Sequence, residues 1–460
     1  MSSNLKTGSL IIEGKTKRIL EIVNDPNNVL MVSKDRITAG DGAKADDMEG
    51  KSVISTETTA KVFEYLSEVG IKTHYVKRHD ERSLIVKKCD MIPIEWVSRR
   101  YATGSFLRRH PGVKEGYCFC PLKLETFYKD DANHDPQWSD EQLICAELVI
   151  GGVTIGKTEV EIMHKTTACI FEALERAWAT LGCSLIDMKV EYGITTTGEI
   201  VLADVIDSDS WRLWPEGDKR KMVDKQVYRN LKEVTPEDLE KVKKNFKWVS
   251  ELVGKFLPKS SGQVVILMGS ASDKDHAVKI KTACEKLGVP AIMRVTSAHK
   301  GPDATMNIIA EYEGHTQPTV FIAVAGRSNG LGPVTSGVSA YPVINCPPIT
   351  ADWGREDIWS SLRMPSGLGC STVLSTDGAA LAAAQMFALT DHVIWSRIKA
   401  KQLNTWVGLK QADVTISKRG LTAKKITLLL SELSSNESGG NELSDMHEES
   451  DDEGIEIDDW

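Results

Sequence analysis

The sequence has no long apolar run, no CxxC pair and no excess of basic charge. Its longest apolar stretches, such as VFIAVAG, are far too short to cross a bilayer, and its first ten residues lack the apolar core of a secretion signal. Its nine cysteines are scattered, without the spacing that binds zinc or supports redox chemistry. We therefore expect a cytosolic protein with reduced thiols and no membrane partner.

Acidic charge is concentrated at the C-terminal end. Residues 431–460 carry twelve acidic side chains and no Lys or Arg, so residues 1–430 carry +3 of the net charge of −9. A nearly neutral body does not favour nucleic-acid binding through bulk charge. Low hydrophobicity predicts a disordered tail over residues 426–460. This tail either keeps the protein soluble or is a regulated interaction segment, since Ser450-Asp-Asp-Glu resembles a site for acidophilic kinases.

Composition divides the remaining chain into two domains. Residues 1–257 mix short strands with amphipathic helices, and the Pro, Ser and Gly of residues 258–262 predict a linker. Residues 263–425 alternate apolar strands with helices, which predicts a three-layer α/β fold with a parallel, flavodoxin-like sheet. An Ala-rich helix is expected over residues 377–402, either as a packing element or as part of the core.

The first domain begins with a glycine- and lysine-bearing turn, Glu13-Gly14-Lys15-Thr16-Lys17, between two expected strands. Glycine lets the backbone approach an anion closely, and the two lysines add positive charge. The turn is not a Walker A loop, because GxxxxGK[ST] is absent. The glycine- and lysine-bearing turn is therefore equally compatible with a phosphate-binding turn and with an exposed hairpin tip.

A second charged feature lies on a predicted strand, where Asp187, Lys189 and Glu191 alternate with apolar residues. The two-residue period of a strand puts all three on one face. The turn TTTG predicts a hairpin that brings Glu191 close to Asp204 on the next strand. Paired carboxylates beside a lysine can hold Mg²⁺ on the phosphates of a nucleotide. The alternative is a half-exposed antiparallel sheet whose wet face is simply charged.

Four segments of the first domain, EGKTKRI, SRRYATGSF, DMKVEYG and DVIDSDSWRLW, together resemble the SAICAR synthetase family. The resemblance implies an α+β, ATP-grasp-like fold and a ligase that phosphorylates the carboxylate of CAIR (carboxyaminoimidazole ribonucleotide) with ATP and joins it to L-aspartate. It implies that Gly14, Lys15 and Lys17 contact ATP, that Glu191 and Asp204 bind ATP through Mg²⁺, that Lys189 and Asp209 are catalytic, and that Arg99, Ser105 and Arg212 bind CAIR or aspartate.

In the second domain, polar or glycine-rich segments follow three successive strands. The segment 269–273 (GSASD) could cradle a phosphate or simply cap the next helix. His299, after the next strand, could transfer a proton near neutral pH or be an ordinary solvated histidine. The glycine-rich segment 326–332 follows the third strand. Because parallel strands end at one edge of a sheet, the three segments together indicate one ligand site there.

The segments MGSASD, TSAHKGP, AGRSNGLGP and PSGLGCSTV resemble the AIR carboxylase family, in the class that adds CO₂ directly to AIR (aminoimidazole ribonucleotide). The resemblance implies no biotin and no metal. It implies that His299 and Lys300 are catalytic, with His299 moving the ring proton of AIR and Lys300 also binding the phosphate and ribose. The residues implied to bind AIR, CAIR or CO₂ are Gly269, Ser270, Ser272, Asp273, Ser297, Gly326, Arg327, Ser328, Asn329 and Gly330.

The order of the two domains resembles that of animal bifunctional enzymes. This implies that one chain makes CAIR and consumes it, with AIR, CO₂, CAIR, aspartate and ATP as small-molecule partners. It also implies a homo-octamer assembled through the carboxylase domain. The alternative is a scaffold protein in which one or both sites are inactive.

Overall fold

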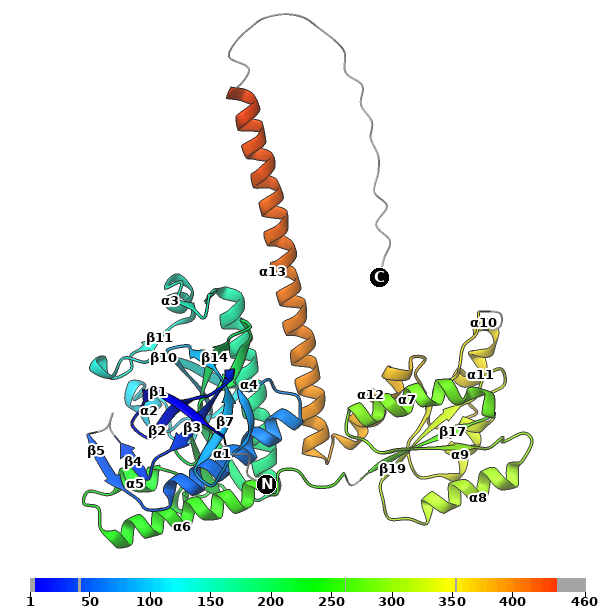
Figure 1. Cartoon of the computed structure of the whole chain (residues 1–460). Coiled ribbons are helices and arrows are strands. Elements are labelled where there is room, and N and C mark those ends of the chain that lie inside the picture. Colours follow the sequence, from blue (N-terminus) through cyan, green and yellow to red (C-terminus); the bar gives the residue numbers. More distant parts are fainter. Residues whose placement is uncertain (1–4, 40–42, 261, 352–353, 437–460) are drawn as a thin grey trace, which may run out of the picture. The chain divides into compact units, whose positions relative to one another are not determined.

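The computed structural model describes residues 5–39, 43–260, 262–351 and 354–436. The N-terminal part begins with a five-stranded antiparallel sheet, in the order β1-β2-β3-β7-β6 (Figure 1). Its strands are β1 (Thr7–Glu13), β2 (Lys17–Ile22), β3 (Asp25–Ser33), β7 (Ser83–Lys87) and β6 (Tyr75–Arg78). The expected strands at the N-terminus are confirmed, and the 14–16 segment joins β1 to β2 as a tight turn.

A second antiparallel sheet is built around the long strand β14, in the order β11-β10-β9-β14-β15, with β8 and β16 also paired to β14. Its strands are β8 (Cys89–Met91), β9 (Ile94–Tyr101), β10 (Cys118–Tyr128), β11 (Gln137–Trp138), β14 (Cys183–Thr195), β15 (Ile200–Ala203) and β16 (Trp211–Pro215). The predicted β14–β15 hairpin is confirmed. Glu191 lies opposite Ala203, so Asp204 follows directly beyond the pair.

Helices pack against both of these sheets. The N-terminal part contains α1 (Lys51–Glu68), α2 (Ser105–Arg109), α3 (Asp140–Cys145), α4 (Lys157–Thr180), α5 (Gln226–Asn230) and α6 (Pro236–Val253), with 3₁₀ turns η1 (Asp131–Asn133) and η2 (Lys219–Lys221) and the ribbons β4 (Arg36–Ala39)–β5 (Lys44–Asp47) and β12 (Val149–Ile150)–β13 (Val153–Thr154). As the helical spacing predicts, Val62, Phe63 and Leu66 of α1 are fully buried. α6 begins with a capping box, in which Thr235 and Asp238 bond each other's backbone N–H groups.

The C-terminal part forms the predicted parallel sheet, in the order β18-β17-β19-β20-β21. Its strands are β17 (Gln263–Met268), β18 (Ala291–Val295), β19 (Thr319–Val324), β20 (Val343–Asn345) and β21 (Cys370–Thr372), and its helical elements are η3 (Ala271–Asp273), α7 (Lys274–Lys286), α8 (Pro302–Glu313), α9 (Leu331–Val338), α10 (Gly354–Asp357), α11 (Trp359–Leu362) and α12 (Thr376–Phe387). This is the flavodoxin-like strand order. The strand after β17 is added on one side of it and the later strands on the other side, so the order of the parallel strands switches between β17 and β19.

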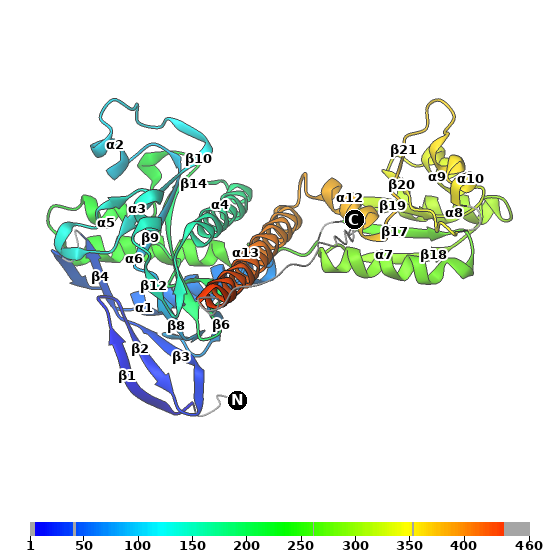
Figure 2. The same cartoon turned by 90° about the horizontal axis from the view of Figure 1, so that it is seen from above.

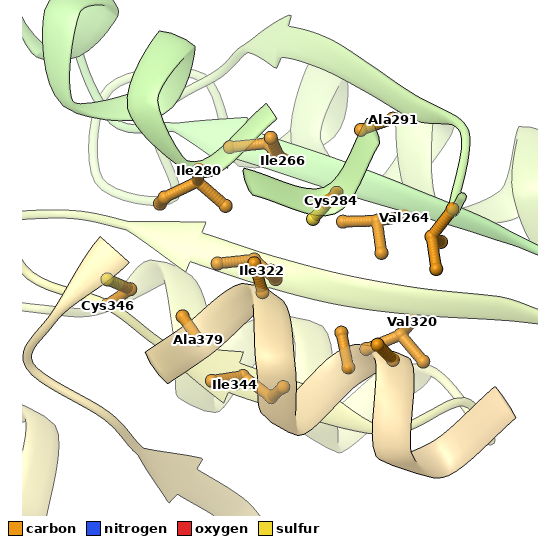
Figure 3. Close-up of a cluster of buried hydrophobic side chains, with 14 of the residues drawn as sticks. Val264, Ile266, Ile280, Cys284, Ala291, Val320, Ile322, Ile344, Cys346 and Ala379 are labelled. Atoms are coloured by element: carbon orange, nitrogen blue, oxygen red, sulfur yellow. The ribbon is translucent and has the colours of Figure 1, made fainter. Parts of the chain in front are cut away.

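The core of this domain lies on both faces of the sheet. On one face, Val264, Ile266 and Ile322 pack against Ile280 of α7 and Ala379 of α12 (Figure 3). On the other face, the alternate residues of β17 and β19 pack against α8 and α9. Because helices cover both faces, the strands are apolar throughout rather than alternating, which is why their sequences are continuous hydrophobic runs. The Ala-rich segment is therefore part of the core.

The sequence-based prediction of one helix over residues 377–402 is wrong. α12 ends at Phe387, and α13 (His392–Asn436) begins after a short break. Asp391 causes the new start, since its Oδ1 accepts the backbone N–H groups of Val393 and Ile394 at 2.9 and 3.1 Å. Figure 2 shows α13 as a separate, continuous helix.

The described chain divides by its contacts after Thr405. Because α13 continues to Asn436, the predicted start of a disordered tail at residue 426 falls inside a helix. The rest of the predicted tail, with Ser450, lies outside the described residues. No helix among the residues described is both long and apolar enough to span a bilayer.

Candidate functional sites

The turn between β1 and β2 carries its lysines in different directions. The Gly14 N–H donates to the carbonyl of Lys17 at 2.9 Å. Lys17 pairs with Asp204 at the end of β15, whereas Lys15 pairs with Asp131 at 3.0 Å and is about half exposed. Lys34 also reaches the turn and donates to the Gly14 carbonyl at 2.9 Å. Of the two predicted lysines, Lys17 is the one that meets the carboxylates.

Glu191 is the centre of a buried charge cluster. It is only 3% exposed, and it accepts hydrogen bonds from Lys129 at 2.8 Å and Lys189 at 2.6 Å. Burial alone would raise the pKa of Glu191, but Lys189, Lys129 and Lys17 outweigh it and lower that pKa to about 2. The charged face of β14 is therefore buried. The alternative of a half-exposed sheet with a wet charged face is wrong.

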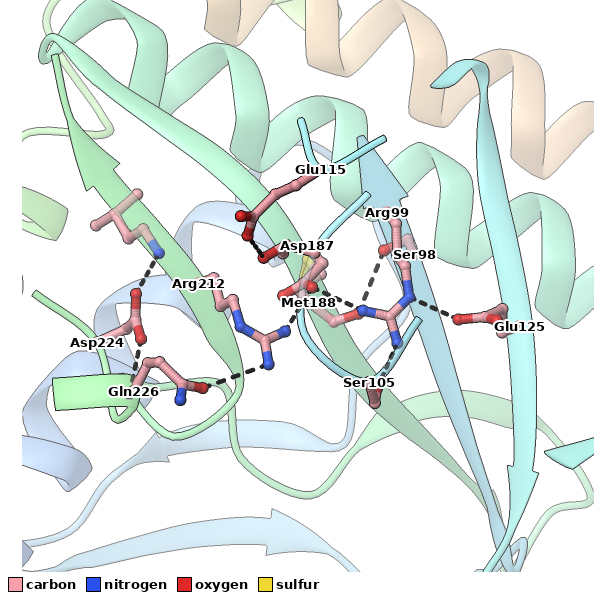
Figure 4. A network of polar contacts seen from close by, with 12 residues as sticks. Ser98, Arg99, Ser105, Glu115, Glu125, Asp187, Met188, Arg212, Asp224 and Gln226 are labelled. Atoms are coloured by element: carbon pink, nitrogen blue, oxygen red, sulfur yellow. Dashed lines mark hydrogen bonds and ion pairs between the residues drawn. The ribbon is translucent and has the colours of Figure 1, made fainter. Parts of the chain in front are cut away.

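Asp187 links two arginines from different strands (Figure 4). Its Oδ2 accepts from Arg99 at 2.8 Å and from Arg212 at 2.6 Å. Arg99 also donates to Glu125 at 2.6 Å and to Ser105 at 3.2 Å, and it is 3% exposed. All guanidinium nitrogens of Arg99 already have partners, so Arg99 holds Ser105 and Asp187 in position. Arg212 and Ser105 are less buried than Arg99 and are therefore the more accessible donors for a ligand.

Asp209 belongs to a neighbouring ion cluster. It pairs with Lys51 at 3.2 Å and Lys225 at 3.3 Å. Burial would raise the pKa of Asp209, but Lys51 and Lys225 lower it to about 2, while burial and Asp209 raise the pKa of nearby Asp207. Lys189 instead bonds Glu191 and Glu95. Among the described ion pairs and hydrogen bonds, Lys189 and Asp209 do not meet.

In the C-terminal domain, the segments after β17 and β19 touch at the point where the strand order reverses. The Gly269 N–H donates to the Val324 carbonyl at 2.9 Å, and a Cβ at Gly269 would lie 3.5 Å from that of Ala325. Ser270 accepts the Ser272 N–H at 3.2 Å, and Asp273 accepts the Ser270 N–H at 3.1 Å. These two side chains form a capping box for the 3₁₀ turn η3, whereas α7 directly after it has no side-chain cap, so the capping expected for the next helix is found one turn earlier. The segment lies at the edge where ligands of such sheets bind.

His299 reaches this edge from the loop after β18. A Cβ on Gly330 would lie 2.6 Å from His299 Nε2, so the imidazole rests against the bare glycine backbone. Ser297 supports the same loop, because its carbonyl accepts the N–H groups of Lys300 and Gly301 at 3.2 and 2.9 Å. His299 and Gly330, predicted to share a site, are thus in contact.

The loop after β19 has one residue that points inward and two that are exposed. Asn329 is 3% exposed, and its side chain donates to Asn345 at 2.9 Å and to Ser361 at 3.0 Å. Arg327 and Ser328 are exposed. Gly326 lies against Pro348, 3.6 Å from where its Cβ would be. The Asn329 side chain therefore fixes the loop, whereas Ser328 is exposed, as is His299.

Comparisons with known proteins decide which family these two sites belong to. Residues 10–246 match the model of SAICAR synthetase, and residues 263–406 match that of AIR carboxylase. The chain is 60% identical over 414 residues to the chicken (Gallus gallus) "Multifunctional protein ADE2", covering 90% of this chain and 97% of that one. It is 60% identical to the human bifunctional phosphoribosylaminoimidazole carboxylase/phosphoribosylaminoimidazole succinocarboxamide synthetase, over 90% of this chain and 97% of that one. The chain belongs to this bifunctional family.

The solved phosphoribosylaminoimidazole-succinocarboxamide synthase of Ehrlichia chaffeensis is 29% identical, with a TM-score of 0.48, over 54% of this chain and 100% of that one. The family carries an AIR carboxylase and a SAICAR synthetase in purine biosynthesis, and both enzyme domains are present here.

Several residues of the synthetase site were missed by the sequence analysis. Lys51 is the first residue of α1 and 2% exposed, although a lysine at a helix start normally predicts a solvated position. Lys129, Lys225 and Lys34 likewise come from segments without a recognisable pattern. Asp187 was placed on the charged face of β14 together with Glu191, but its pairing with two arginines from other strands was not predicted.

Gly330→Ala is expected to lower AIR carboxylation by about 10²-fold, because the new methyl group would displace the His299 ring and small displacements of reacting groups are costly. Steady-state assays of both activities of the purified chain would measure this, with SAICAR synthesis unchanged. Gly337→Ala in α9 is the control, since its Cβ would make an ordinary 3.5 Å contact with Leu368. Equal carboxylation rates in the two variants would contradict the assigned contact.

Asp187→Asn is expected to destabilise the synthetase domain by about 3 kcal/mol, because Arg99 keeps only Glu125 as a carboxylate partner and Arg212 loses the carboxylate with which it pairs. The midpoint of denaturant unfolding, followed in the full chain, would report this change. Glu240→Gln is the control. Glu240 lies 3.9 Å from Lys243 on the exposed side of α6, and its loss should leave the midpoint unchanged. A midpoint for Asp187→Asn equal to that of the control would refute the structural role of Asp187.

Proposed function

We propose that the N-terminal domain, with an ATP-grasp-like fold, uses ATP and Mg²⁺ to join CAIR to L-aspartate, giving SAICAR, ADP and phosphate. One observation carries this proposal: Lys17, Lys129 and Lys189 surround Glu191 and Asp204 beside the Gly14 turn. One buried and one partly buried carboxylate among three ammonium groups suit a polyanion together with a divalent cation.

The donor set of this cluster fits Mg²⁺·ATP. Glu191 and Asp204 supply the hard oxygen ligands that Mg²⁺ prefers. Lys17 supplies positive charge for the phosphates, and Gly14, which has no side chain, lets the backbone approach them closely. When bound, Mg²⁺ neutralises phosphate charge. Lys15, with its partner Asp131, lies at the outer side of the turn, so a phosphate contact by Lys15 requires exchange of that partner.

The remaining residues bind and orient the two other substrates. Arg212 and Ser105 donate to the phosphate of CAIR or to a carboxylate of aspartate, and Arg99 positions both through Asp187 and Ser105. A CAIR carboxylate oxygen attacks the γ-phosphorus, ADP leaves, and an acyl phosphate forms. The aspartate amine then attacks the acyl carbon, phosphate leaves, and the amine loses a proton. Lys189 and Asp209 act here by fixing charge rather than as nucleophiles.

We propose that the C-terminal domain carboxylates AIR with CO₂ and uses no metal and no biotin. The electron-rich ring carbon of AIR attacks CO₂, a C–C bond forms, and the ring proton leaves to His299. Ser270, Ser272, Asp273, Ser297, Lys300 and the Gly269 backbone bind the phosphate and ribose of AIR. Arg327, Ser328, Asn329 and Gly330, with Gly326 before them, hold CO₂ and the new carboxylate. The contact between His299 and Gly330 supports this assignment.

We further propose the domain limits 1–257 and 263–425 with a linker at 258–262, a cytosolic location and a homo-octamer formed through the carboxylase domain. Nucleic acid and membranes are not partners. These statements follow from the family and from the composition of the chain.

Separate assays test the two activities. The purified chain should form SAICAR from CAIR, ATP and aspartate, and ADP with it, and should convert AIR with bicarbonate to CAIR in the absence of ATP. Failure of one reaction would leave that domain without its proposed activity. Failure of both would favour a scaffold that organises other enzymes.

A further inference from the structure

The loop after β19 is held by two short helices that lie about 30 residues later in the chain, α10 and α11. Asp357 Oδ2 accepts the Arg327 N–H at 3.1 Å. Ser360 Oγ accepts the Asn329 N–H at 2.9 Å, and its hydroxyl lies 2.9 Å from the Arg327 carbonyl and 2.8 Å from that of Asp357. The single hydroxyl hydrogen can go to either carbonyl. Ser360 therefore bridges the backbone on both sides of Ser328.

The backbone of this loop is in a conformation that needs such support. Arg327 has a φ of 54°, in the left-handed region that residues other than glycine rarely occupy. A residue stays in this region when its surroundings fix it there. Both polar backbone groups of Arg327 lie within hydrogen-bond distance of α10 and α11 side chains, which is the support that this conformation requires.

The same contacts decide which donors of the loop remain for a ligand. The N–H groups of Arg327 and Asn329 are bound to Asp357 and Ser360, and that of Gly330 is bound to the Ser328 carbonyl at 3.0 Å. Within the described part of the chain, neither the N–H nor the hydroxyl of Ser328 has a hydrogen-bond partner. Ser328 is exposed, two residues from the glycine against which His299 rests.

We propose that Ser360 is a positioning residue for the carboxylation reaction, and that it fixes the loop so that the available N–H and hydroxyl of Ser328 donate to CO₂ and to the new carboxylate. This inference rests on the proposed carboxylase function of the domain. Ser360 does not touch substrate in this account. It acts by holding Ser328 at a fixed distance from the His299 ring, so its loss should weaken the hold on CO₂ more than the hold on the nucleotide.

The test compares three variants of the full chain. Ser360→Ala removes the bridge and is expected to raise the KM for CO₂ about tenfold, with the KM for AIR and the rate of SAICAR synthesis unchanged. Ser360→Thr keeps the hydroxyl and should restore the wild-type KM. Ser339→Ala is the matched control, because Ser339 also donates once, to Glu313, and accepts once, from the Tyr341 N–H at 3.0 Å, but lies before the amino end of β20.

The outcomes separate this inference from the function on which it rests. Three results would overturn the positioning role while leaving the carboxylase function intact. They are a wild-type KM for CO₂ in Ser360→Ala, parallel rises in the KM values for CO₂ and AIR in that variant, and an equal defect in Ser339→Ala. A wild-type chain that makes SAICAR but never converts AIR would instead overturn the proposed carboxylase function, and this inference with it. A selective rise that Thr reverses supports the role.

Discussion

His299→Ala is expected to lower AIR carboxylation by about 10²–10⁴-fold, the usual contribution of a general base, while SAICAR synthesis proceeds at the wild-type rate. The structure places the His299 imidazole, a side chain that can accept a proton, against Gly330 in the loop after β19. Its removal should leave the capping box of Ser270 and Asp273 and the buried Asn329 unchanged. Steady-state rates of both reactions, measured on one preparation, would show the expected asymmetry.

The control for this variant is His315→Ala, a histidine of the same domain that follows α8 and packs edge-on against Tyr312 at a ring separation of 6.4 Å. Both activities of that variant should equal those of the wild type. If His299→Ala kept more than about a tenth of its carboxylation rate, a group other than His299 would have to remove the ring proton. Loss of both activities would indicate a folding defect or coupled sites.

Asp204→Asn is expected to reduce SAICAR synthesis by about 10³-fold and to spare AIR carboxylation, because it removes one of two carboxylates that face the Gly14 turn and the partner of Lys17. Asn is the appropriate substitution. Asp204 has a φ of 61°, a left-handed conformation that Asn tolerates and that would strain Ala. Initial rates with saturating CAIR and aspartate, over a range of Mg²⁺·ATP concentrations, would measure the loss.

Glu216→Gln is the matched control for this variant. Glu216 is also a carboxylate at positive φ, 55°, paired with a lysine, Lys221, but on the exposed surface. Its SAICAR synthesis should equal that of the wild type. Full activity in Asp204→Asn would exclude Asp204 as a ligand for the metal–nucleotide complex and leave Glu191 as the remaining candidate.

Regular patterns of the sequence predict those parts of the sites that depend on backbone geometry. The two-residue period of β14 and the TTTG turn place Glu191 near Asp204, because a hairpin fixes the register of its strands. The parallel sheet brings the segments after β17, β18 and β19 to one edge, because parallel strands end together. Both expectations need no knowledge of side-chain packing.

Side-chain direction and long-range contacts are not encoded in such patterns. Lys15 and Lys17 are equivalent in the sequence, yet only Lys17 meets a carboxylate of the β14–β15 hairpin, because Asp131 lies within reach of Lys15. The sequence pattern implies that Asn329 binds the ligand, but its side chain points inward and donates to Asn345. Ser360 has no local signal, since its partners lie about 30 residues earlier. The break before α13 depends on a single capping residue, Asp391, in an otherwise helical run.

One chain carries both activities, so the product of the carboxylase domain should become the substrate of the synthetase domain, and a carbon label can follow this transfer. The purified protein would be given AIR, ¹³C-bicarbonate, Mg²⁺·ATP and aspartate, and the product examined by mass spectrometry and carbon NMR. The carboxylate carbon added to AIR becomes the amide carbonyl of SAICAR, so we predict one ¹³C per SAICAR, at that carbonyl, and at least about 10²-fold less labelled SAICAR with His299→Ala. SAICAR without label, or CAIR that accumulates without becoming SAICAR, would contradict it.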